Sequence, residues 1–246
     1  DYVAGLGSAY SSLGDTFRDI GKNAEAIEPY KKAIAIREQL VKDHPDVPVY
    51  ASNLASSYHN LGNGFSQCSH PDEASKAFNK SIVIGQLLVK KHPEVATYAS
   101  QLGWSYYRLG NELSGLDKPK ESIVAYNKAI VIREQLVKKY PDVPLYAWKL
   151  AETFTNLGSR LRDLAKHKDS IEAFSKSIAI YEQLVKDQPE YPGYASNLAY
   201  GIGVRAAVVA ESGDHASAVE TAEKLALLKV EGNRPTGRAL NLYNAA

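Results

Sequence analysis

The stretch LVKKHPEVATYASQLGWSYYRLGNEL, residues 88–113, decides how the chain is organised, because the sequence contains it three times in closely similar form. The copy before it is LVKDHPDVPVYASNLASSYHNLGNGF (40–65), and the copy after it is LVKKYPDVPLYAWKLAETFTNLGSRL (136–161). Consecutive copies are 48 residues apart, and the proline that follows the Val-Lys pair recurs at Pro45, Pro93, Pro141 and Pro189. A fixed period of this kind indicates a structural unit that stacks on the next copy of itself.

The composition is that of a globular protein and excludes several classes of function. The 246 residues are 44% hydrophobic and 23% charged, and the net charge of +1 gives no electrostatic reason to expect a nucleic-acid or membrane-surface partner. The single cysteine, Cys68, rules out an intrachain disulfide and fits a reducing compartment. We find no signal peptide and no apolar run of membrane-spanning length, so we expect an intracellular, cytoplasmic location. Position 1 is not Met, and we expect the chain to be part of a longer protein.

Each copy has the pattern of two helices. In the second copy one apolar stripe follows helical spacing, and Asp46 is its expected N-cap. A break follows at 69–71, and a second apolar stripe then ends before Pro93. The first stripe is Tyr50, Leu54, Tyr58, Leu61 and Phe65, and the second is Ala74, Phe78, Ile82, Leu87 and Leu88. Strand patterning is absent. We predict an all-α chain of ten helices in five pairs, forming one array of repeats at 1–44, 45–92, 93–140, 141–188 and 189–234, with the start of a further helix at 235–246. The fifth copy diverges, and its second helix is expected to break at 232–235.

The repeat resembles a known family. Tyr58-x2-Leu61-Gly62-x2-Phe65 followed by Ala74-x3-Phe78 is similar to the tetratricopeptide repeat pattern, although the period is 48 rather than about 34. The excess of 14 divides into two turns for each helix. The phrase AIAIREQLVKDHPDV (33–47) resembles long-helix repeats of the kinesin light chain type, and the 48-residue form resembles arrays that follow a Ser/Thr kinase domain in some bacterial proteins. The resemblance implies a right-handed superhelical solenoid of helix-turn-helix repeats.

The five copies serve as an internal alignment. Columns that stay the same, such as those of Tyr2 and Leu6, are expected to pack between repeats, and Leu61, Leu109 and Leu157 should hold the scaffold. Columns that vary lie on one side of the first helix, which in tetratricopeptide arrays lines the concave groove. The predicted groove residues are His59, Asn60, Asn63, Trp104, Tyr107, Arg108, Asn111, Trp148, Asn156 and Arg162. The aromatic rings would anchor apolar side chains, the arginines would meet acidic groups, and the asparagines would bind a peptide backbone. The alternatives are that a neighbouring helix covers the tryptophans and that the asparagines are only solvated.

The predicted function is a protein-protein interaction module that holds a peptide or a partner helix in its groove. Two alternatives stay open, namely a regulatory or scaffolding segment of a larger bacterial signalling protein such as a Ser/Thr kinase, and self-association by end-to-end stacking. No nucleophile, base and orienting residue can be proposed from the spacing, so we expect no enzyme activity. The histidines include no pair at helical metal-ligand spacing, and we expect neither a metal site nor a cofactor.

Overall fold

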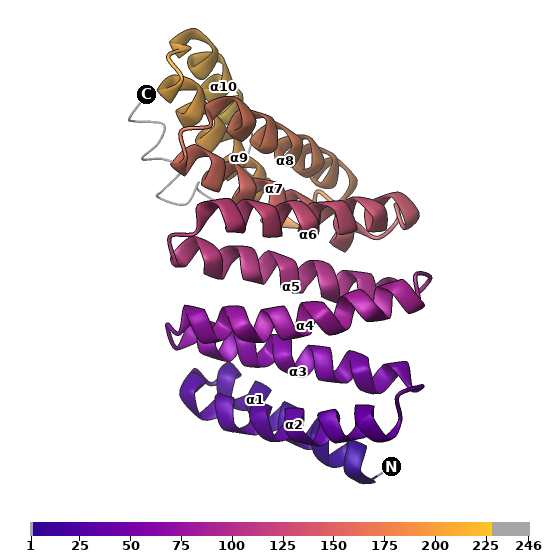
Figure 1. The fold of residues 1–246 in the computed structure, drawn as a ribbon. Coiled ribbons are helices and arrows are strands. Elements are labelled where there is room, and N and C mark those ends of the chain that lie inside the picture. Colours follow the sequence, from indigo (N-terminus) through magenta and orange to yellow (C-terminus); the bar gives the residue numbers. More distant parts are fainter. Residues whose placement is uncertain (1, 228–246) are drawn as a thin grey trace. The chain divides into compact units, whose positions relative to one another are not determined.

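The structure, a computed structural model, describes residues 2–227, and side chains up to residue 222. This part of the chain contains ten α-helices and no strand, as the sequence predicts (Figure 1). The helices are α1 (Tyr2–Asp19), α2 (Asn23–Asp43), α3 (Pro48–Gln67), α4 (Pro71–Lys91), α5 (Ala96–Gly115), α6 (Pro119–Lys139), α7 (Pro144–Asp163), α8 (His167–Asp187), α9 (Pro192–Glu211) and α10 (His215–Leu227). The helix predicted at 235–246 and the break predicted at 232–235 lie outside the described residues.

The chain divides into two compact units, residues 1–132 and residues 133–246, which we call unit 1 and unit 2. In unit 1, helices α1 to α5 pack against their neighbours in chain order, and the first part of α6 completes the unit. Unit 2 contains the rest of α6 and helices α7 to α10, of which α7 to α10 again pack in chain order. Contacts between successive helices are what a repeat that stacks on its own copy requires.

The turn inside each helix pair has one backbone conformation, repeated every 48 residues. Its central residue has a positive φ in all five pairs, at Gly21, Ser69, Asp117, Ala165 and Gly213. In the second pair the His70 amide donates to the carbonyl of Phe65 at 2.9 Å and the Ser69 amide donates to that of Ser66 at 3.0 Å. This pair of bonds is a Schellman motif, which satisfies carbonyls at the end of the first helix. It fixes where the second helix starts.

The Leu-Gly pair of the motif has a packing role. A Cβ built on Gly62 would lie 2.7 Å from the ring of Phe78, and one on Gly110 would lie 2.7 Å from the ring of Tyr126. Both rings are almost fully buried. In the first four pairs the aromatic residue of the second helix therefore lies directly against the backbone of the first helix, which only glycine allows.

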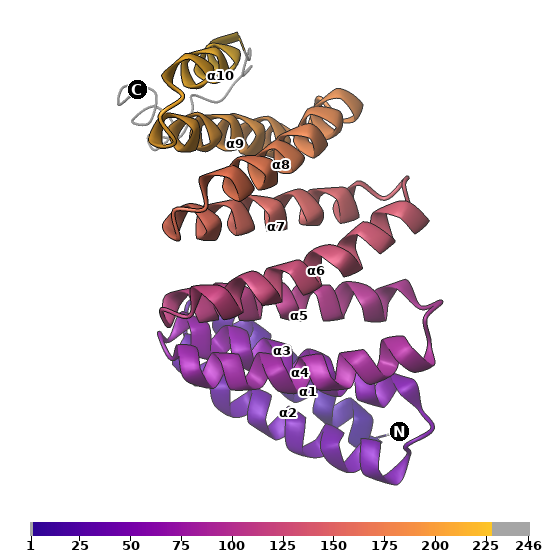
Figure 2. The same cartoon turned by 45° about the horizontal axis from the view of Figure 1, so that its top comes forward.

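The core of unit 1 lies between each second helix and the pair that follows it. One cluster joins α2 to α3 and α4, and its buried members are Ala26, Tyr30, Ile34, Leu54, Tyr58, Leu61 and Ala77. The predicted scaffold leucines Leu61, Leu109 and Leu157 are at most 8% exposed. Among the first helices, α3 also contacts both α1 and α5. Figures 1 and 2 show that these first helices follow one another along one side of unit 1 and that the second helices follow one another along the other.

Three sequence-based expectations need correction. The N-cap of α3 is Val47 rather than Asp46, no side chain bonds to the cap, and Pro48 stands in the first turn. Leu87, placed in the buried stripe, is 56% exposed. Leu88 supplies the buried contact at that turn of the helix. In the first copy Leu6 is 40% exposed, whereas Leu54 in the same column is 6% exposed.

Candidate functional site

Three of the predicted groove residues form one aromatic stack in unit 1. The rings of Trp104 and Tyr107, on neighbouring turns of α5, are stacked with centroids 5.3 Å apart and an interplanar angle of 19°. The His59 ring on α3 lies 6.0 Å from that of Trp104. His59 and Tyr107 are each 6% exposed, whereas Trp104 is half-buried. The Trp104 ring therefore contacts two buried rings while part of its side chain remains accessible.

Arg108 lies next to this stack and is held by polar side chains beneath it. Its Nη2 donates to the Ser66 hydroxyl at 3.3 Å, and that hydroxyl donates to Glu112 Oε1 at 2.7 Å. The guanidinium carbon lies 5.7 Å from the centre of the Phe78 ring, within the range of a cation–π contact. Glu112, which is 8% exposed, places a buried carboxylate at the end of this chain of hydrogen bonds. Arg108 itself is half-buried.

Two buried nitrogen atoms at this cluster have no hydrogen-bond partner within the described part of the chain, namely His59 Nε2 and Arg108 Nε. Burial, with the positive charges of Arg108 and Arg18 as smaller causes, lowers the pKa of His59 to about 3. The imidazole is therefore neutral at physiological pH, and its Nδ1 lies 3.1 Å from the hydroxyl of Ser105. We call His59, Trp104, Tyr107 and Arg108 the α3–α5 cluster.

Other variable positions form hydrogen bonds with residues of the preceding repeat. Asn60 donates to Asp15 Oδ1 at 3.3 Å, and Gln101 Nε2 donates to the Ser52 carbonyl at 3.3 Å. Gln101 and Glu112 were not singled out from the sequence. The sequence could have indicated both residues, because residues about 45–49 apart lie side by side in such an array. Gln101 and Ser52, and Glu112 and Ser66, have this separation. Part of the variation in these columns thus serves contacts between repeats.

The remaining predicted residues lie apart from the cluster. Asn111 accepts a hydrogen bond from the Tyr126 hydroxyl at 2.5 Å, and Asn63 is half-buried. In unit 2, Trp148 is half-buried against the core around Tyr181 and Leu198, and the Lys149 Nζ lies 4.0 Å from its ring centre.

Arg162 already has an acidic partner within unit 2. Its Nε donates to both carboxylate oxygens of Glu211, at 3.1 and 2.9 Å, and this joins α7 to α9. Asn156 is half-buried on the same helix as Arg162.

The described residues were also searched for metal-binding clusters and for membrane-spanning helices. Among the side chains that the structure places, no group of three His, Cys, Asp or Glu residues could hold a metal ion. No described helix has the length and apolar character needed to span a membrane.

Comparisons with known proteins agree with this fold. Models of the tetratricopeptide repeat match residues 6–46, 105–135 and 150–190, and no curated protein sequence matches the chain. Among solved structures, BtubC (BKLC) from P. vanneervenii superposes with a TM-score of 0.67 at 17% identity, covering 95% of this chain and 84% of that one. The putative kinesin light chain repeats of Podosopora anserina give 0.61 at 16%, covering 94% and 98%. YrrB, a tetratricopeptide protein with an unusual peptide-binding site, gives 0.51 at 16%, covering 96% and 90%. At these identities the likeness to solved structures concerns the fold. The matched segments are therefore tetratricopeptide repeats, and the described part of the chain has the fold of an array of such repeats.

Proposed function

We propose that the chain is a protein-interaction module that binds a peptide segment of a partner at the α3–α5 cluster of unit 1. The observation that supports this most is the contrast inside the cluster. Trp104 and Arg108 are partly accessible, and the side chains of His59, Tyr107 and Glu112 beneath them are buried. Tryptophan and arginine are the residue types that dominate binding energy at interfaces, and a rigid support lowers the entropy lost on binding.

The chemistry of the cluster suggests what the peptide carries. The face of the Trp104 ring offers apolar contact area, which suits a large aliphatic or aromatic side chain. Arg108 donates one hydrogen bond to Ser66, and its Nε has no partner among the described residues. A carboxylate or backbone carbonyl of the peptide would accept a hydrogen bond from an N–H of the partly accessible guanidinium. One solved neighbour of the same fold, YrrB, is described as having a peptide-binding site, which is consistent with this use of the fold.

The test is a selection of random 12-residue peptides displayed on phage against the whole chain, followed by calorimetry with the selected peptides. We expect Trp104→Ala to weaken binding at least tenfold while the circular dichroism spectrum stays helical. The matched control is Val83→Ala on α4, because Val83 is 57% exposed and two sister positions already carry alanine. Equal affinities for the parent and the folded Trp104→Ala variant would contradict the proposal. A parallel Trp148→Ala variant tests the predicted contribution of unit 2.

A second candidate is self-association through α1. Tyr2 and Leu6 are 86% and 40% exposed, and Leu13 is 43% exposed, whereas the same columns are largely covered in later repeats. These residues match a surface on which another repeat can stack. Light scattering against concentration checks this. A rise in mass that Leu6→Glu abolishes would support self-association, and a constant monomer mass would exclude it. The role as a regulatory segment of a larger kinase stays a prediction.

A further inference from the structure

The second-helix side of unit 1 carries a hollow that the groove does not involve. It has a volume of about 560 Å³ and lies between α4 and α6, over α5. Leu102 and Tyr106 on α5 form its floor and are 5% and 6% exposed, and Val124 and Val131 on α6 form its wall and are 53% and 54% exposed. The volume falls within the range of about 300–1,000 Å³ that ligand pockets have. We call it the α4–α6 hollow.

The charged group at this hollow is Lys128. Its Nζ lies 5.3 Å from the centre of the Tyr106 ring, and the hydroxyl of that ring accepts a hydrogen bond from Gln86 at 2.7 Å. Lysine stands at the same position in all five repeats, and in the first four its ammonium group lies over an aromatic ring. The members of this lysine column are Lys32, Lys80, Lys128, Lys176 and Lys224.

In the other repeats a carboxylate of the chain stands near this lysine. Lys176 pairs with Glu172, four residues earlier, at 2.8 Å, and Glu28 stands four residues before Lys32. Lys80 donates to the Tyr58 hydroxyl at 3.3 Å, and that hydroxyl donates to Glu38 on the preceding second helix. The sequence thus has an acidic residue in at least one of two columns, namely four residues before the lysine or in the Glu38 column of the preceding second helix.

In the repeat of Lys128 neither of these positions has an acidic residue. Val124 stands four residues earlier where Glu28 and Glu172 stand in sister repeats, and Gln86 replaces Glu38 across the hollow. Within residues 2–222 the structure places no carboxylate in ion-pair contact with Lys128. The same two substitutions remove the negative charge and add apolar surface, because valine replaces glutamate at the wall.

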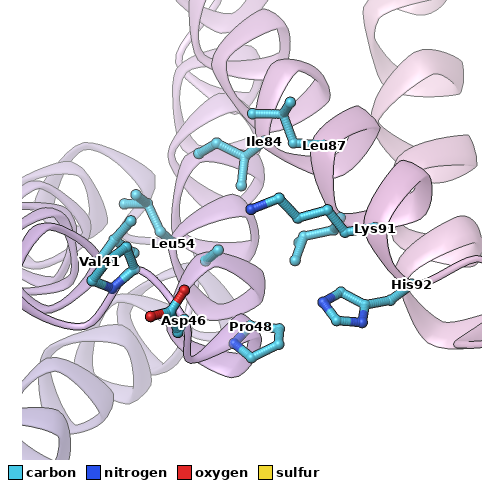
Figure 3. A pocket seen from close by; sticks show the side chains of 11 residues that line it. Val41, Asp46, Pro48, Leu54, Ile84, Leu87, Lys91 and His92 are labelled. Atoms are coloured by element: carbon cyan, nitrogen blue, oxygen red, sulfur yellow. The ribbon is translucent and has the colours of Figure 1, made fainter.

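The neighbouring pocket between α2 and α4 differs in this respect. It measures about 410 Å³ and is lined by apolar residues such as Leu54 and Ile84, together with both Asp46 and Lys91 (Figure 3). The lining of that pocket therefore contains both a negative and a positive side chain. The α4–α6 hollow supplies only the cation, and α4 carries no acidic residue after Glu73. The charge of this surface therefore calls for a negative partner.

We propose that the α4–α6 hollow binds a protein segment in which an aspartate or glutamate stands next to a large apolar residue. The carboxylate takes the position that Glu172 takes beside Lys176 and accepts a hydrogen bond from Lys128 Nζ. The apolar side chain enters the hollow against Leu102, Tyr106 and Val131. This site lies on the second-helix side, separate from the α3–α5 cluster, and does not depend on it.

The experiment uses the same displayed library of random 12-residue peptides on the whole chain, with variants that copy the sister repeats. Val124→Glu and Gln86→Glu each return a carboxylate that another repeat already carries, and both positions are exposed, so the fold is expected to hold. We expect a class of selected peptides with an acidic residue beside a large apolar one. Calorimetry should show binding of this class weakened about tenfold or more by Val124→Glu, and unchanged by Trp104→Ala.

Charge reversal gives an independent arm. Lys128→Glu should lose the acidic peptides and select peptides with lysine or arginine at the same place. The proposal is overturned if the selection yields no peptide whose binding Val124→Glu weakens, or if the acidic peptides bind the Lys128→Glu variant equally well. Peptides that respond to Trp104→Ala alone would support the α3–α5 cluster and refute this hollow. Peptides that respond to Val124→Glu alone would do the reverse.

Discussion

His59 Nδ1 lies 3.1 Å from the hydroxyl of Ser105, 46 residues later in the sequence. Both side chains are buried, so a neutral imidazole joins two consecutive repeats inside the first-helix layer. Ser105 belongs to a column in which every repeat has a small residue, and its hydroxyl also lies 3.0 Å from that of Ser81 on α4. Small polar side chains thus connect three helices at a place where the sequence pattern indicates close backbone packing.

The burial of His59 makes stability depend on pH. Its pKa is lowered to about 3 in the folded chain, whereas an unfolded histidine titrates near 6.5. The unfolded state therefore binds one more proton between these values, so this contribution to stability is present above pH 6.5 and is lost as the pH falls toward 3. The slope for one proton is about 1.4 kcal/mol per pH unit.

Denaturant unfolding at a series of pH values measures this slope. His59→Gln should reduce the dependence by one proton, and His70→Gln, at an exposed turn position, serves as the control. Identical slopes for the parent and His59→Gln would show that the imidazole is protonated in the folded state.

Leu54 and Leu6 occupy the same column of the repeat but differ in the exposure of their side chains. Leu54 is 6% exposed and Leu6 is 40% exposed. Leu54→Ala should therefore cost about 2–5 kcal/mol in the free energy of unfolding, and Leu6→Ala less than about 1 kcal/mol. Urea unfolding followed by circular dichroism compares the two. A similar loss for both would mean that another chain covers Leu6 in solution.

Gly110 and Gly115 lie on one helix but in different surroundings. A Cβ on Gly110 would lie 2.7 Å from the Tyr126 ring, whereas one on Gly115 meets nothing within 4 Å. We expect Gly110→Ala to lower the free energy of unfolding by about 1–3 kcal/mol and Gly115→Ala to be neutral or to raise it by up to about 1 kcal/mol. The midpoints of thermal unfolding should move in opposite directions or differ clearly in size. Equal shifts would contradict the packing role of the Leu-Gly pair.

The period predicts the fold well because each helix, turn and core column repeats with it. The bounds of α3 and α4 follow from the break at 69–71 and from Pro93. What the period could not predict is how an individual residue in a variable column is used. Asn60 bonds to Asp15 and Arg162 to Glu211, so variation there reflects matched pairs between repeats as well as freedom to bind a partner. Exposure also depends on the neighbouring repeat, which is why Leu6 and Leu87 differ from expectation.

Ala165 occupies the left-handed turn position with a φ of +53°, where the first and fifth pairs have glycine. A non-glycine residue in this conformation costs about 1 kcal/mol. Ala165→Gly should therefore raise the free energy of unfolding by about 0.5–1 kcal/mol, and Gly21→Ala should lower it by a similar amount. Both are measured by thermal unfolding of the whole chain. A loss of stability in Ala165→Gly would mean that the entropy of the unfolded chain outweighs the relief of strain.

Arg37 is a buried cation that the sequence pattern did not single out. It is 8% exposed, and its Nη1 donates to the Asn53 carbonyl at 3.0 Å and to the Ser57 hydroxyl, which joins α2 to α3. Burial lowers the pKa of its guanidinium, although Asp15 raises it in part. The group remains charged, because arginine titrates far above neutral pH. Hydrogen bonds from a charged donor are worth about 1.5–3 kcal/mol.

Arg37→Ala should therefore lower the free energy of unfolding by at least about 2 kcal/mol, since it removes these bonds and the packing of the side-chain stem. Arg37→Met keeps most of the stem and should lose less. Chemical unfolding of both variants separates the two contributions. If methionine costs as much as alanine, the hydrogen bonds to Asn53 and Ser57 carry the effect, and if methionine costs nothing, the cation is dispensable between these repeats.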